Sequence, residues 1–161
     1  ICYRSHNGGI MLQGGKANRI ANNIFVDSET SQGQIANFAN NSTGQVMERN
    51  IFHYTNTNAT LFALGKLTPE VIRLDHNLYF CPGLKEPRVG WGGRTSFRDW
   101  QQQGFDGHSL VADPRFVDAE HDNYALHPDS PAFKLGFEAI DTGKIGLLRD
   151  RCRCQIQPAS P

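Results

Sequence analysis

The chain has 161 residues, enough for one domain with a sizeable core, and its 16 basic and 16 acidic residues cancel. The absence of a basic excess argues against a nucleic-acid partner, and no apolar run approaches the length that crosses a membrane. Abundant asparagine and 16 glycines, without stretches of helical period, predict a turn-rich all-β protein.

The chain begins at Ile1 with no charged leader and no signal-type apolar segment. We therefore expect either that a leader has been removed or that the chain is a piece of a longer protein. Cys2, Cys81, Cys152 and Cys154 fit no zinc pattern, and the sequence leaves open whether they form disulfides or stay unpaired. No metal or cofactor motif is present, so we predict neither.

Three short motifs recur at an interval of 27 residues and predict a repeat architecture. Each motif has an asparagine, an aliphatic residue and an aromatic residue, at 23–25, 50–52 and 77–79. An apolar residue three positions before each asparagine keeps the same interval: Ile20, Met47 and Leu74.

The recurring asparagine suits a sharp bend, because asparagine tolerates the left-handed backbone region. If neighbouring strands stack about 4.8 Å apart, the side-chain amides of Asn23, Asn50 and Asn77 would hydrogen-bond in a ladder. We expect the aliphatic residue after each asparagine to point into the interior.

Short apolar runs predict the other strands of each coil. They lie at 10–12, 19–20, 34–38, 45–47, 59–64, 71–74 and 88–91. Ile35, Phe62 and Val89 are also 27 residues apart, so we expect them to lie in register on neighbouring coils. A hairpin meander would not hold this phase, whereas a parallel solenoid requires it. We predict a parallel β-helix of about four coils over residues 1–94.

Residues 95–104 predict a short helix that begins the closing region. Thr95 or Ser96 can cap its N-terminus, Asp99 lies in its first turn, and Gly104 ends it. Short segments interrupted by proline follow. We expect residues 95–146 to form an irregular cap over the last coil, and residues 147–161 to be a mobile tail.

The sequences at 22–25, 113–118 and 128–137 resemble the C-terminal part of right-handed parallel β-helix proteins of the pectate-lyase-like superfamily. More narrowly, 100–114 and 135–141 resemble secreted bacterial members grouped with glycoside hydrolases and polysaccharide lyases. The resemblance implies a right-handed β-helix, a carbohydrate ligand and a secreted or periplasmic location. Because the coils are few and 148–161 depart from the family pattern, we expect a truncated member.

Two carboxylates are the candidate catalytic residues. Glu48 and Asp75 each lie two residues before a ladder asparagine, so they should stack on adjacent coils, as paired acids in sugar cleavage require. Arg73, His53 and His76 lie near the same bend and are candidate substrate-binding residues. The alternative is a solvated outer corner with alternating charges.

Tyr54, Trp91 and Arg94 complete the candidate substrate-binding residues. An exposed aromatic ring can stack on the apolar face of a sugar, and an arginine can bind its polar groups. The alternative for Trp91 is packing in the core or against the cap.

Two functions follow. The first is a carbohydrate-binding or carbohydrate-active segment, which would be a glycoside hydrolase or polysaccharide lyase if it is an enzyme. Four coils give a groove only about 15–20 Å long, short for cleaving a polymer. The second is a non-enzymatic module that self-associates through its uncovered first coil. The corresponding partners are a polysaccharide and a second copy of the chain.

Overall fold

The computed structural model describes residues 1–35, 43–64 and 67–142. Its strands are β1 (Cys2–Tyr3), β2 (Ile10–Leu12), β3 (Arg19–Ala21), β4 (Ile24–Val26), β5 (Ser31–Ile35), β6 (Gln45–Glu48), β7 (Ile51–His53), β8 (Thr60–Leu64), β9 (Ile72–Asp75), β10 (Leu78–Phe80), β11 (Arg88–Val89), β12 (Thr95–Ser96), β13 (Leu110–Val111), β14 (Phe116–Asp118) and β15 (Asn123–Leu126). The helices are α1 (Phe97–Gln102) and the 3-10 turns η1 (Trp91–Gly93), η2 (Ala119–His121) and η3 (Pro131–Leu135).

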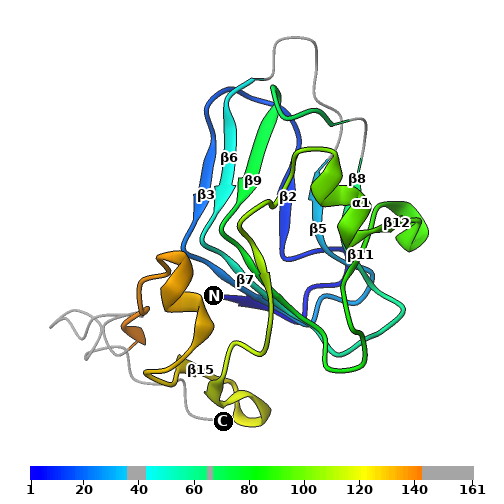
Figure 1. The fold of residues 1–161 in the computed structure, drawn as a ribbon. Coiled ribbons are helices and arrows are strands. Elements are labelled where there is room, and N and C mark those ends of the chain that lie inside the picture. The colour runs from blue at the N-terminus through cyan, green and yellow to red at the C-terminus, as the bar shows by residue number, and fades with distance from the viewer. Residues whose placement is uncertain (36–42, 65–66, 143–161) are drawn as a thin grey trace, which may run out of the picture.

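Three parallel sheets form the body of the protein (Figure 1). Their strand orders are β1-β4-β7-β10-β13, β2-β5-β8 and β3-β6-β9, so the chain visits each sheet in turn and returns to it with every third strand. The fold is therefore all-β with parallel sheets, as the repeat predicted. In the described ranges, no helix is long and apolar enough to span a membrane.

The register of the strands confirms the repeat where the asparagine motifs lie. Ile24 pairs with Ile51, and Ile51 pairs with Leu78. The neighbouring sheet keeps the same interval, since Met47 pairs with both Ile20 and Leu74.

The predicted register of the middle strands is wrong by two residues between β5 and β8. Ile35 pairs with Leu64, and Gly33, rather than Ile35, pairs with Phe62. A shift of two residues leaves every side chain on the same face of the strand, so the apolar pattern is blind to it. The next interval holds, because the Gly90 N–H donates to the Phe62 carbonyl at 2.9 Å.

The predicted fourth coil is only partly regular. The strand expected at 88–91 ends at Val89, because Gly90 has a left-handed φ of 83° and η1 follows. β11 pairs antiparallel with β12 instead of continuing a parallel sheet. Residues 36–38 of another predicted strand lie outside the described ranges.

Aromatic rings fill the interior between the sheets. Phe52 stacks on Phe25 with centroids 4.9 Å apart and on Tyr79 at 5.5 Å, and Phe62 meets Phe52 edge to face. The aromatic residue of each motif therefore points inward. The expectation that the aliphatic residue does so is wrong, and strand alternation explains the exchange.

The aliphatic residues Ile24, Ile51 and Leu78 lie on the opposite face of the five-stranded sheet. They form a second core with residues of the C-terminal segment: Tyr124, Ala132, Leu135 and Phe137. That segment, yellow to orange in Figure 1, lies along the outer face of the sheet. Both faces of β4, β7 and β10 are thus buried, which suits parallel strands.

The helix α1 closes the interior, with Phe97 and Trp100 in the aromatic core. The Ser96 hydroxyl accepts from the Asp99 N–H at 3.1 Å, which confirms the predicted N-cap and the acidic first turn. β13, from the same closing segment, extends the five-stranded sheet. The predicted tail, 147–161, lies outside the described ranges with Cys152 and Cys154, whereas Cys2 and Cys81 are free thiols.

Candidate functional site

The predicted asparagine ladder is present and fixes the corner on which the candidate site lies. The Asn23 side-chain amide donates to Asn50 Oδ1 at 3.1 Å, and the Asn50 amide donates to Asn77 Oδ1 at 3.1 Å. The backbone N–H groups of Asn23 and Asn50 donate to the same two oxygens. The ladder ends on the buried Asp106, whose Oδ1 accepts from the Asn77 amide at 3.2 Å.

The left-handed bend lies one residue before the position predicted from the sequence. The residues with positive φ are Asn22 at 59°, Arg49 at 52° and His76 at 57°. The ladder asparagines are therefore required for their amide groups, and the bend is made by the residue before them. As a result, Arg49 and His76 turn outward directly beside Glu48 and Asp75.

Arginines surround Glu48 on three sides. Its carboxylate accepts from Arg19 Nη2 and Arg73 Nη2, each at 2.8 Å, and lies 3.5 Å from Arg49 Nη2. Burial works against ionisation, but the hydrogen bonds from Arg19 and Arg73 outweigh it and lower the pKa of Glu48. At neutral pH this residue is a carboxylate and has no proton to donate.

Asp75 on β9 pairs with Glu48 on β6, as predicted, but the two carboxylates have different partners. Its Oδ2 lies 2.8 Å from His108 Nδ1 and 3.2 Å from His76 Nδ1. Its Oδ1 accepts from the backbone N–H groups of His108 at 2.8 Å and His76 at 3.0 Å. Burial opposes ionisation here too, and the His108 hydrogen bonds outweigh it, so the pKa of Asp75 is lowered.

Sequence reasoning missed His108, because only the pairing of β10 with β13 brings it to Asp75. Asp75, His76 and His108 each offer a metal-ligand atom, and these atoms lie within 4.8 Å of one another. This cluster is thus the place in the described residues where a metal ion could be held, although no motif predicted one.

His53 and Tyr54 do not join this corner. His53 lies on the outer face of the five-stranded sheet between the rings of Phe80 and Phe116, at 5.7 and 5.6 Å, and burial lowers its pKa. Tyr54 is 0% exposed, in a small core with Cys81, and burial raises its pKa. The expectation of an exposed Tyr54 ring that stacks on a sugar is therefore wrong.

Trp91 and Arg94 lie near another sheet. Trp91 begins η1, which packs beside β8, and the Trp91 side chain is outside what the structure describes. Arg94 follows η1 and is exposed. Neither residue shares the β6–β9 face with Glu48 and Asp75.

An open cavity of about 320 Å³ lies beside η1, and sequence reasoning missed it; polar residues surround it, although most of its exposed lining is apolar. Its polar lining consists of Glu29, Thr30, Ser31, Asn56, Asn58 and Thr60, and it extends to Gly92. These residues come from two turns and from the first residues of β5 and β8, so no sequence pattern singled them out. They meet because β5 and β8 are neighbours and the Asn56 amide donates to the Glu29 carbonyl at 2.9 Å.

Two side chains that line the cavity have no hydrogen-bond partner among the described residues. The Asn58 backbone N–H donates a hydrogen bond to Asn56 Oδ1 at 3.0 Å. The side chains of Asn58 and Thr60 make no hydrogen bond to any other residue in ranges 1–35, 43–64 and 67–142. Both can therefore bind an external hydroxyl.

No family model, curated protein or solved structure matches this chain. The family resemblance of the sequence stays a prediction.

Proposed function

We propose that the chain is a carbohydrate-binding module built as a right-handed parallel β-helix of the pectate-lyase-like kind. Support for the β-helix comes from the three parallel sheets, the return to each sheet with every third strand, and the asparagine ladder. Crossovers between parallel strands are right-handed almost without exception. The resemblance of 113–118 and 128–137 agrees with this architecture and with a secreted or periplasmic location.

The proposal of a carbohydrate ligand rests on the cavity beside η1. Its volume is near the lower end of the range for small-molecule sites, about 300–1,000 Å³, and suits a ligand of one or two sugar rings. Asn58 and Thr60 offer an amide and a hydroxyl, and Glu29 offers one carboxylate oxygen, since its Oε2 is paired with His6 Nδ1; these groups pair with sugar hydroxyls. The side chain of Ala63 supplies an apolar contact.

Binding without cleavage is the version that we propose. Hydrolysis of a glycosidic bond needs a carboxylic acid that holds a proton near neutral pH, and therefore a raised pKa. The Glu48 carboxylate is bound by three arginines, which favour its charged form. Both oxygens of Asp75 are also occupied by amides and imidazoles.

The test is an array of neutral and uronate-containing oligosaccharides, followed by titration of any hit against Asn58→Ala. This variant removes the free amide and keeps the backbone bond to Asn56, so we expect binding to weaken about tenfold, the value of one or two hydrogen bonds. Asn123→Ala, also at an exposed asparagine but in β15, should bind like the unchanged chain. An array without hits, or equal affinities for the two variants, would refute the proposal.

A specific observation also favours the second function, self-association. β1, β2 and β3 lie at the same end of the three sheets, and each pairs with one strand in the described part of the chain. Three of its five exposed large hydrophobic residues lie on or beside these strands: Ile1, Tyr3 and Met11. Unpaired strand edges with apolar side chains are surfaces to which further strands add.

A further inference from the structure

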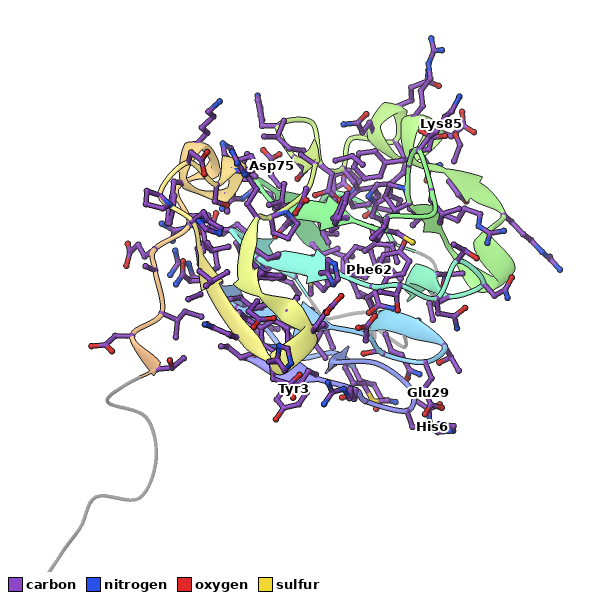
Figure 2. All side chains as sticks on the ribbon, turned by 90° about the horizontal axis from the view of Figure 1, so that it is seen from below. Tyr3, His6, Glu29, Phe62, Asp75 and Lys85 are labelled. Carbon is purple, nitrogen blue, oxygen red and sulfur yellow. The ribbon has the colours of Figure 1, made fainter. Side chains whose placement is uncertain are left out.

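We propose that Asp75, His76 and His108 form a binding site for a divalent transition-metal ion, with Zn²⁺ as the best match. This site does not depend on the proposed carbohydrate function. Glu29, in the cavity beside η1, and Asp75 lie on opposite sides of the molecule (Figure 2).

The backbone places the two imidazoles at equivalent positions on neighbouring strands. Leu78 pairs with Leu110, and each follows a histidine by two residues, His76 and His108. The left-handed φ of His76, 57°, turns this residue outward at the corner. The two rings stack with centroids 5.1 Å apart and planes inclined by 26°, so both present Nδ1 to the same carboxylate.

Asp75 is held in the orientation that a ligand carboxylate needs. Oδ1 is occupied by two backbone N–H groups, at 2.8 and 3.0 Å, which fix the plane of the carboxylate. Oδ2 is left facing both imidazoles, at 2.8 and 3.2 Å. Hydrogen bonds that orient a ligand from behind are a regular feature of protein metal sites.

The spacing fits a small tetrahedral ion. Ligand atoms at the usual zinc distances, 2.0–2.2 Å, lie about 3.3 Å from one another around a tetrahedron. The separation of Asp75 Oδ2 from His76 Nδ1, 3.2 Å, matches this value, whereas its separation from His108 Nδ1, 2.8 Å, is a hydrogen-bond distance that must lengthen when an ion replaces the proton; all three ligand atoms lie within 4.8 Å of one another. The rings have room to adjust to an ion, since His108 is 75% exposed and His76 is 44% exposed.

The ligand set selects the class of ion. Two imidazole nitrogens and one carboxylate oxygen suit Zn²⁺, Co²⁺, Ni²⁺ or Cu²⁺, whereas Ca²⁺ and Mg²⁺ require oxygen ligands. Glu48, the other acid of this face, forms ion pairs with three arginines. Asp75 is therefore the carboxylate that can bind the metal ion. Three protein ligands at an exposed corner leave a fourth position for water or an external ligand.

The experiment is titration with Co²⁺ alone, followed by displacement with Zn²⁺, in a chain whose Cys2, Cys152 and Cys154 are replaced by serine to remove competing thiolates; the remaining thiol, Cys81, is buried. We expect one equivalent of Co²⁺ to give visible absorption bands of tetrahedral cobalt, and Zn²⁺ to abolish them. Stoichiometric Zn²⁺ should also shift the imidazole ¹⁵N resonances of His76 and His108.

Two variants and a matched control make the test specific. His76→Ala and His108→Gln should weaken Zn²⁺ binding at least about tenfold, because even the partners that only orient a ligand are worth this much. The glutamine keeps a hydrogen-bond donor for Asp75, so we expect the His108→Gln variant to stay folded. Circular dichroism of this variant and of the unchanged chain checks this. His121→Ala removes an exposed imidazole that also contacts an aspartate, Asp118, at 2.8 Å, but that pair lacks a second ring. It should bind Zn²⁺ normally. Absence of stoichiometric binding, or equal affinity in His108→Gln and His121→Ala, would overturn the site.

Discussion

The ladder asparagines are held by more hydrogen bonds than any turn residue requires. Asn50 Oδ1 accepts from the N–H and the side chain of Asn23, and its own amide donates to the Ile20 carbonyl at 3.0 Å. Because Asn50 is buried, water cannot take over its hydrogen bonds if its side chain is removed. This explains why asparagine recurs there while the residue before it varies among asparagine, arginine and histidine.

Replacing Asn50 by alanine should therefore destabilise the protein strongly. The variant removes the two hydrogen bonds that Asn50 Oδ1 accepts from Asn23 and the three that the Asn50 amide donates, while the backbone N–H of residue 50 still reaches Asn77 Oδ1. We expect a loss of about 2–4 kcal/mol in the free energy of unfolding. Urea denaturation followed by circular dichroism measures it. Asn58→Ala, at an exposed asparagine whose side chain makes no hydrogen bond to the described residues, should change the value by less than about 0.5 kcal/mol. Similar losses in the two variants would contradict the structural role of the ladder.

At the scale of elements, the strands β4, β7 and β10 are covered on both faces. Their inward aromatic residues stack, and their outward aliphatic residues hold the C-terminal segment. The sequence places an aliphatic and an aromatic residue next to each other in each motif. This order does not show which of the two side chains faces the interior between the sheets. The C-terminal segment determines which side chain faces outward, because its apolar residues bury the aliphatic side chains on the outer face in a second core.

Ile51→Ala should loosen this cover. Ile51 is 1% exposed, and removal of a buried isoleucine side chain to alanine costs about 2–5 kcal/mol. We also expect faster amide hydrogen exchange in β15, which packs on this face through Tyr124. Val117→Ala, at an exposed valine of β14, is the matched control and should leave both stability and exchange nearly unchanged. Unaltered exchange in the Ile51 variant would mean that the cover does not depend on the sheet.

For the molecule as a whole, the two ends of the sheets differ. α1 and the aromatic core close one end, while β1, β2 and β3 are edge strands at the other. Met11, on β2, is 60% exposed at that edge. The proposed self-association would use this edge.

Met11→Lys should weaken self-association, because a charge on an edge strand opposes strand addition. Sedimentation velocity over a range of concentrations should show the dissociation constant rising about tenfold or more, which corresponds to about 1.4 kcal/mol. Val117→Lys places the same charge on the antiparallel pair β14–β15 and should not change association. If the unchanged chain is monomeric at high concentration, the second function is wrong.

The sequence by itself determined the parallel repeat, its 27-residue interval, the asparagine ladder and the capped helix, because these depend on local chemistry that recurs along the chain. Only the tertiary structure decided which face of each strand is the interior, the two-residue shift between β5 and β8, the burial of Tyr54, and the meeting of His108 with Asp75. The physical reason is that a strand pattern of period two records alternation but not direction or even shifts. Contacts between distant segments exist only once the sheets are assembled.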